Sequence, residues 1–328
     1  MTPRSAVSFR TLGLTTLIAG SLGLPGCGDS QRQATVRPQP PIDDWAYSID
    51  TGVGGRPDTT RPMSDPLRLT YYGLPVSNPL AEPAPVQLFN SGYAVGYDAA
   101  TKTPIWASYR LFAGAGSGPA AKGAVSPIPD ERVVAVPPVD EAAKANQPKG
   151  QGDYGKNSQF QARLLVPSAP IAGNYGEDAG HQTQLSSNVV PVRMSTGGDV
   201  WDQITDLESR YASAYDELWV LAGPLPGTDQ TLPSGAAISE GFWKIHVTVR
   251  KGRTRIQAFI VPQPAAEKNA QQKTDLADYL VSVAEIEQKT GLSFFPDCHD
   301  IDGDTAELRR IQVPEGLWAT ERETTASR

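Results

Sequence analysis

The 328-residue sequence contains only two cysteines, Cys27 and Cys298, too few for the disulfide framework of a small secreted domain. It also has no surplus of basic residues, because 29 Lys and Arg stand against 36 Asp and Glu for a net charge of −7. That balance excludes a general attraction to nucleic acid or to anionic membranes, although a local basic patch is compatible with it. No internal repeat is present, which excludes a repeat architecture.

The N-terminal residues have the pattern of a bacterial secretory signal. Two arginines precede the apolar run LGLTTLIAGSLGLPG, which is too short and too rich in glycine for a membrane span. The LPGC sequence that ends at Cys27 resembles a lipobox, in which the cysteine is lipidated and becomes the new N-terminus. We therefore expect residues 1–27 to be a lipoprotein signal peptide, with Cys27 anchoring an exported chain in a membrane of the bacterial envelope. The alternative is an ordinary signal peptide with a chance cysteine.

Composition divides the remaining chain into three parts. Residues 28–64 are polar and rich in proline and glycine, which is typical of a flexible tether. Residues 65–315 contain the apolar segments and predict one domain, long enough for a sizeable core. Residues 316–328 are predicted to form a polar tail.

The hydrophobic pattern predicts an α+β fold. Alternating apolar and polar residues, or short apolar runs, predict strands within residues 67–76, 92–112, 216–225 and 241–263. Helical spacing predicts one helix over residues 199–215 and a second that begins after Thr274 and ends at Gly291. Because strands and helices do not alternate in a regular βαβ rhythm, we expect a central, mostly antiparallel sheet with packed helices.

Six segments, in order along the chain, resemble the DNA/RNA non-specific endonuclease family of the ββα-metal superfamily. They are GYAVGYDAATKTPIWASYRL, DYGKNSQFQARLLVPSAP, EDAGHQTQLSSNVVPV, DELWVLAGP, GFWKIHVTVRKGRTRIQAFIVPQ and VSVAEIEQKTGLSFFPD. The resemblance runs from about Asn90 to Pro296 and implies a ββα-metal nuclease-like fold. It also implies hydrolysis of phosphodiesters with a divalent metal, usually magnesium, an asparagine ligand, and a histidine as general base.

The family's reactive residues are missing where the resemblance places them. Its Asp-Arg-Gly-His motif aligns with Gln161, Ala162, Arg163 and Leu164. Leu164 thus stands at the general-base position and cannot accept a proton. Gly197 stands at the position of the metal-binding asparagine, four residues before Trp201, and Thr205 stands where a glutamate is expected. Activity is therefore predicted to be weak, altered or lost, and whether the chain is an enzyme stays open.

A displaced site is an alternative. The stretch DAGH that ends at His181 also resembles the motif, which would make His181 the general base, although a solvent-facing helix residue explains it as well. Asn188 and Asp199 are the metal-ligand candidates of such a site. The competing interpretation gives Asn188 a structural hydrogen bond in a turn and makes Asp199 a helix cap.

Other polar residues have weaker assignments. Arg163, Arg193 and Lys244 are candidate phosphate contacts, which would bind in a salt-dependent manner, or else they are scattered surface charges. His246 alternates with apolar strand residues and either packs in the core or faces solvent. Asp300, Asp302 and Asp304 have the spacing of a calcium loop but lack its late glutamate, which favours an acidic surface loop.

The sequence thus predicts an exported, membrane-anchored lipoprotein with an endonuclease-like domain. Magnesium and nucleic acid are the cofactor and partner that the resemblance implies, and the lipid would contact the membrane. The alternative is a catalytically inactive pseudonuclease that binds nucleic acid or a protein, and a purely structural envelope lipoprotein is a third hypothesis.

Overall fold

A computed structural model describes residues 51–52, 56–57, 69–77, 84–114, 125–133, 153–154, 158–194, 200–250, 253–263, 275–297 and 316–321. Contacts divide the chain into two units, Met1–Gln39 and Pro40–Arg328, and all described residues belong to the second. The predictions for Cys27, Gly197 and Asp199 fall outside the described residues, as do those for Asp300, Asp302 and Asp304.

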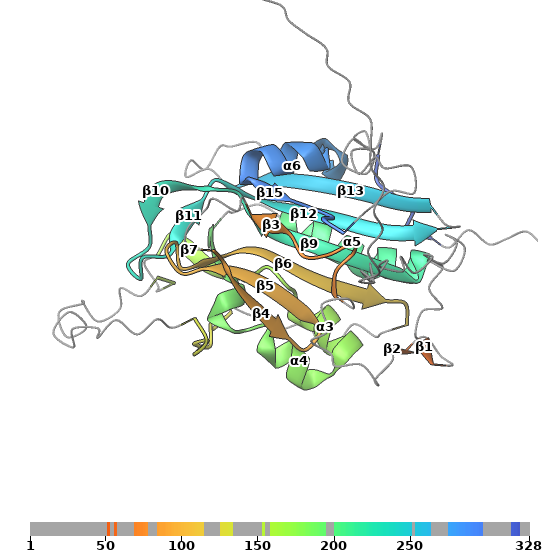
Figure 1. Cartoon of the computed structure of the whole chain (residues 1–328), viewed down its shortest axis with the longest axis horizontal. Helices are drawn as coiled ribbons and strands as arrows, with labels where there is room; N and C mark the ends of the chain where they lie inside the picture. Colours follow the sequence, from red (N-terminus) through yellow and green to blue (C-terminus); the bar gives the residue numbers. More distant parts are fainter. Residues whose placement is uncertain are drawn as a thin grey trace, which may run out of the picture. The chain divides into compact units, whose positions relative to one another are not determined.

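A seven-stranded sheet forms the centre of the described fold, with strand order β14-β13-β12-β9-β6-β5-β4 (Figure 1). Its strands are β4 (Val86–Asn90), β5 (Tyr93–Asp98), β6 (Thr103–Phe112), β9 (Glu217–Pro224), β12 (Gly241–Arg250), β13 (Arg253–Pro262) and β14 (Leu280–Val281). Every neighbouring pair is antiparallel. The predicted α+β class with a mostly antiparallel central sheet is therefore confirmed.

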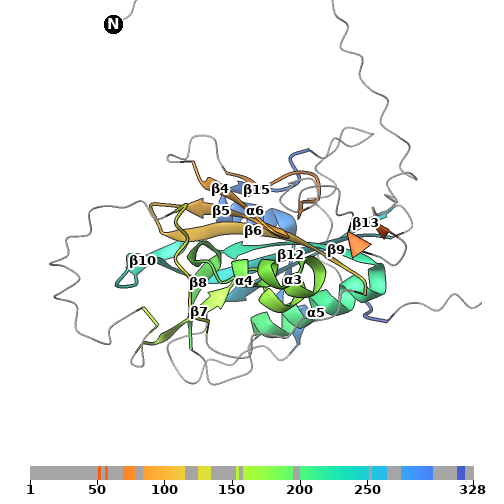
Figure 2. The same ribbon diagram turned by 90° about the horizontal axis from the view of Figure 1, so that it is seen from below.

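Helices cover both faces of this sheet. Helices α3 (Ser168–Tyr175), α4 (Glu177–Gln182) and α5 (Val200–Tyr215) lie on one face, and α6 (Val283–Thr290) lies on the other (Figures 1 and 2). Helix α5 buries the predicted apolar stripe, which comprises Val200, Ile204, Leu207 and Tyr211. None of the described helices is both long and apolar enough to cross a membrane.

The central sheet separates two hydrophobic cores, one on each face, and strand β12 contributes side chains to both. Because side chains alternate across a strand, Phe242, Lys244 and His246 point toward α5, whereas Trp243, Ile245 and Val247 pack in the core that contains α6. Since both faces are covered, almost the whole strand is buried.

The remaining elements are short. Four two-stranded pairs are formed by β1 (Thr51–Gly52) with β2 (Arg56–Pro57), β3 (Val76–Ser77) with β15 (Leu292–Ser293), β7 (Phe160–Leu164) with β8 (Val189–Arg193), and β10 (Gly227–Thr231) with β11 (Ala237–Ser239). Two 3-10 turns, η2 (Ser186–Asn188) and η3 (Leu276–Tyr279), complete the described elements.

Two predicted elements differ from the structure. Of the described residues 69–76 in the first predicted strand, only Val76 is in a strand. Leu69 is instead buried, and its carbonyl accepts a hydrogen bond of 2.7 Å from Ser108. The predicted helix after Thr274 is broken into η3, β14 and α6. The Ser282 hydroxyl accepts from the Glu285 amide at 3.1 Å and caps α6, which ends at Gly291 as predicted.

The predicted polar tail contains one core residue. Trp318 is buried and packs against Tyr211 and Tyr215 of α5, with ring centroids 5.1 and 5.7 Å away. This indole therefore extends the core that covers the α5 face of the sheet.

Close packing at Gly96 gives a test of the core on the α6 face of the sheet. A Cβ atom at Gly96 would lie 2.3 Å from the indole of Trp106 on the neighbouring strand. We expect Gly96→Ala to lower the free energy of unfolding by about 1–3 kcal/mol through overpacking, measured by urea titration. Gly316→Ala is the control, because nothing lies within 4 Å of the added atom. Equal stability of the two variants would contradict the packing described.

Candidate functional site

Strands β7 and β8 and helix α5 form a strand-strand-helix unit. The strands pair antiparallel from Phe160 opposite Arg193 to Leu164 opposite Val189, so the four aligned motif positions all lie on β7. The connection from β8 to α5 passes through residues 195–199, which are outside the described part of the chain. Leu164 is half-buried at the end of β7 and presents only carbon atoms there.

Arg163 binds the first turn of α5. Its Nη1 atom donates to Oδ1 of Asp202 at 2.5 Å. The arginine side chain is only 15% exposed, whereas that of Asp202 is 65% exposed. Arg163 thus ties β7 to the helix, and it would have to release Asp202 to act as the predicted phosphate contact.

Lys244, also predicted as a phosphate contact, lies inside the core. Its Nζ donates to the Glu208 carboxylate and, at 2.7 Å, to the Thr205 hydroxyl, and it stands 4.3 Å from the centre of the Trp201 ring. Both charged side chains of the Lys244–Glu208 pair are fully buried. The prediction of a phosphate contact at Lys244 is therefore wrong. Side chains alternate along β12, so Lys244 points toward α5, where no phosphate has access.

Both oxygens of the Glu208 carboxylate have hydrogen-bond partners, of which Lys244 is one. Its Oε2 atom accepts from the hydroxyl of Tyr109 on β6 at 2.8 Å. Burial would raise the pKa of Glu208, but the Lys244 ammonium and His246 together hold that pKa below its usual value. Burial lowers the pKa of Lys244, and the attraction of Glu208 opposes this only in part.

His246 lies beside this ion pair. It is fully buried, and its Nε2 atom is 3.5 Å from Oε1 of Glu208, at the outer limit of hydrogen-bond range. The structure therefore selects the packed alternative that the strand pattern left open.

Sequence reasoning missed Glu208 because it expected the glutamate one helical turn earlier, at Thr205. Residues three apart share a helix face, so Thr205 and Glu208 both reach Lys244. The available signal was a glutamate within the apolar stripe of α5, opposite a lysine and a histidine that alternate with apolar residues in β12.

His181 lies on the surface of α4. Its side chain is 64% exposed, and its Nε2 atom stands 3.8 Å from Oε1 of Glu177, one turn earlier in the helix. The structure therefore agrees with the alternative interpretation, in which His181 is a solvent-facing helix residue and not a general base.

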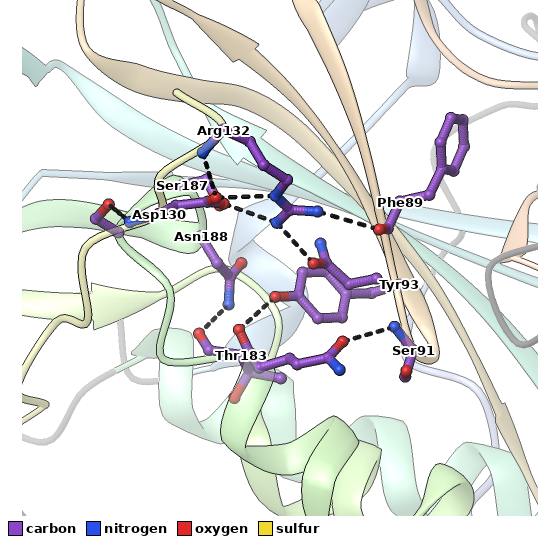
Figure 3. A network of polar contacts seen from close by, with 11 residues as sticks. Phe89, Ser91, Tyr93, Asp130, Arg132, Thr183, Ser187 and Asn188 are labelled. Atoms are coloured by element: carbon purple, nitrogen blue, oxygen red, sulfur yellow. Dashed lines mark hydrogen bonds and ion pairs between the residues drawn. The ribbon is translucent and has the colours of Figure 1, made fainter. Parts of the chain in front are cut away.

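Asn188 uses its amide in backbone hydrogen bonds. The oxygen accepts from the amide of Val166 at 3.0 Å, and the nitrogen donates to the Val166 carbonyl at 3.1 Å. The nitrogen also donates to the Thr183 carbonyl at 2.8 Å (Figure 3). Because the side chain is fully buried, this arrangement favours the structural interpretation over a metal ligand. It fixes the chain directly after β7.

A second polar network, which the sequence did not indicate, lies next to Asn188 (Figure 3). The buried carboxylate of Asp130 accepts from Arg132 at 2.7 and 2.8 Å and from Ser187 at 2.6 Å. Burial would raise the pKa of Asp130, but these hydrogen bonds hold it below its usual value. Arg132 also donates to Asn90 at 2.8 Å, so the network attaches the loop of residues 125–133 to β4 and η2.

Arg193 is the remaining candidate phosphate contact. It is partly exposed at the end of β8, where Nη1 donates to Gln159 at 3.2 Å and the guanidinium lies 4.8 Å from the ring centre of Phe160. Both contacts are weak, so this guanidinium can turn toward an anion.

The described residues do not fit a divalent cation. Within them, no group of three or more His, Cys, Asp or Glu side chains comes together as a metal site. At the positions where the resemblance expects the base and the glutamate, Leu164 has no donor and Thr205 is bound by the Lys244 ammonium. No reaction step can therefore be assigned to a metal held by these side chains.

The chain belongs to the DNA/RNA non-specific endonuclease family, whose family model matches residues 76–301. This family typically uses a divalent metal and acts on nucleic acid. The mitochondrial nuclease EXOG of Xenopus laevis is 24% identical over 277 residues, which cover 76% of this chain and 69% of that protein. The human mitochondrial nuclease EXOG is 23% identical over 223 residues, which cover 63% of this chain and 56% of that one.

Among solved structures, the chain is similar to one from a crystal structure of the EndoG/EndoGI complex, which concerns the mechanism of EndoG inhibition. The TM-score is 0.51 at 17% identity, and the match covers 69% of this chain and 89% of that one. The similarity supports the α+β nuclease fold assigned above.

The buried ion pair gives a second test. We expect Lys244→Met to lower the free energy of unfolding by about 3–5 kcal/mol, because Glu208 would keep a buried charge without its partner. Urea titration would measure the loss. The double variant Lys244→Met with Glu208→Met should recover much of it, since both charges are then absent. A double variant less stable than Lys244→Met would contradict the coupling.

Proposed function

We propose that this domain keeps the frame of the non-specific endonuclease family but cleaves nucleic acid weakly or not at all. We further propose that it belongs to an exported lipoprotein anchored through Cys27. The observation that carries the first proposal is Leu164, half-buried at the end of β7 where the family resemblance expects the general base.

The proposal rests on proton transfer. Hydrolysis of a phosphodiester requires a group that takes a proton from the attacking water, and a leucine has no atom that can do so. Of the two histidines that the structure describes, His246 is fully buried and His181 lies on the surface of α4. Neither of them is on β7, where the resemblance expects the base.

The cationic groups support the same proposal. Lys244 is neutralised by Glu208 inside the core, and Arg163 is paired with Asp202. Of the three candidate phosphate contacts, Arg193 is the one held by no carboxylate in the described part of the chain. Together with the net charge of −7, this predicts weak binding of nucleic acid, because few cations remain to neutralise phosphates.

One observation favours a second candidate function, a working but displaced nuclease. The exposed imidazole of His181 is accessible to a substrate, which a general base requires. This version predicts that metal-dependent cleavage by the chain falls in His181→Ala, whereas the leading proposal predicts no cleavage for that substitution to remove.

Restoring the family's residues tests the leading proposal. We expect the double variant Leu164→His with Gly197→Asn to cleave plasmid DNA with magnesium about 100-fold faster than the unaltered chain, because general-base catalysis typically contributes that much. The matched control is Leu164→Phe with Gly197→Asn, which changes the same positions without a proton acceptor. A restored variant that cleaves no faster than this control would contradict the role assigned to Leu164.

The lipid anchor has its own test. We expect the full chain, produced in a bacterial host, to sediment with the membranes, and Cys27→Ala to remove it from that fraction. Cys298→Ala is the control, because the other cysteine lies far from the lipobox-like sequence. Equal membrane association of both variants, measured by fractionation and immunoblotting, would contradict lipidation at Cys27.

A further inference from the structure

Glu208, Lys244 and His246 form a buried charge cluster between α5 and the central sheet. All three side chains are fully buried. The His246 imidazole is incompletely satisfied, because Nδ1 has no hydrogen-bond partner among the described residues and Nε2 has only the 3.5 Å contact with Glu208. A buried polar group without a partner is costly, so its presence at this position requires a physical account.

The charges of the cluster balance only while His246 is neutral. The Lys244 ammonium and the Glu208 carboxylate are in direct contact and cancel one another. A proton on His246 would therefore leave one positive charge uncompensated in the core, where its desolvation is expensive. The contact of 3.5 Å to Glu208 offsets part of this cost, but that carboxylate already binds Lys244 and Tyr109.

Among the described residues, the charged groups that act on His246 are Glu208 and Lys244. Asp202 and Arg163, which pair with one another, act on Lys244 with opposite signs. The uncharged groups around the cluster are Tyr109 of β6, Thr205 and Tyr211 of α5, and Gln257 and Phe259 of β13. Burial raises the pKa of Tyr109 well above its ordinary value and that of Tyr211 to about 12, so both stay neutral in acid. The Tyr211 hydroxyl donates its hydrogen bond to Gln257 at 2.9 Å and not to the His246 imidazole.

We propose that the buried charge cluster is an acid-sensitive lock that holds α5 against the sheet while His246 is neutral. Protonation of His246 favours release of the helix, because only opening lets water solvate the added charge. Helix α5 also supplies Asp202, which binds Arg163 of β7. Opening of the lock would therefore loosen the whole β7-β8-α5 unit, whether or not that unit cleaves nucleic acid.

The sign of the pH dependence follows from His246. Burial lowers its pKa below the ordinary 6.5, and Glu208 opposes this only in part. Well above pH 6.5 the folded and unfolded chains both carry a neutral imidazole, and this residue contributes no pH dependence. As the pH falls below 6.5, the unfolded chain binds a proton that the folded chain refuses, so stability is lost until the pH reaches the lower pKa of the folded state.

Unfolding of the full chain at a series of pH values tests the lock. Between about pH 6.5 and 5, one extra proton bound by the unfolded state raises the unfolding equilibrium constant up to about tenfold per pH unit. We expect this His246 component to disappear in His246→Gln and to persist in His181→Gln, which removes an exposed imidazole instead. Identical pH dependence in the unaltered chain and in His246→Gln would overturn the proposal.

A measurement on the unaltered side chain covers the case in which His246→Gln does not fold. The chain has three histidines, so NMR signals of the imidazole carbons can be assigned with the single variants His181→Gln and His299→Gln. We expect the remaining signal to stay in the neutral form as the pH falls through 6.5, and to show protonation only at lower pH or on unfolding. Protonation of that imidazole near pH 6.5 in a folded chain would overturn the lock.

Discussion

The ion pair between Glu208 and Lys244 is the constraint on which the described fold depends most. Removing two such charges from water costs several kcal/mol for each ion, so the pair is tolerated only with nearly complete hydrogen bonding. Thr205 and Tyr109 provide that bonding from α5 and β6, and the pair therefore joins three elements at one point. Through α5 it also fixes Asp202, the residue that anchors β7.

The same arrangement supports the proposal that the domain keeps a nuclease fold with weak or no activity. The carboxylate that the family resemblance expects at Thr205 stands one turn further along α5, where it neutralises a core lysine. The position expected for the base holds Leu164, packed against neighbouring strand residues. Glu208 and Lys244 stabilise the unit through burial and charge balance, and Leu164 offers no group for proton transfer.

Sequence patterns predicted the elements whose signal is local. The apolar spacing of α5, the hairpin formed by β12 and β13, and the C-terminal glycine Gly291 all follow from periodicity or turn chemistry. Lys244 was placed at the surface because alternation in a strand separates two faces but does not say that both are covered. The contacts of Asp130 with Ser187 join segments more than 50 residues apart, which no local pattern encodes.

The most direct test of the account is single-turnover cleavage by the unaltered full chain, with protein in excess over plasmid DNA or RNA. Magnesium, manganese and a chelator would be compared, and circular dichroism would show that the chain is folded. The account predicts that cleavage does not exceed the rate seen with chelator. Cleavage that depends on the metal and is abolished by chelator would contradict it, and would place a working base and ligand set elsewhere in the chain.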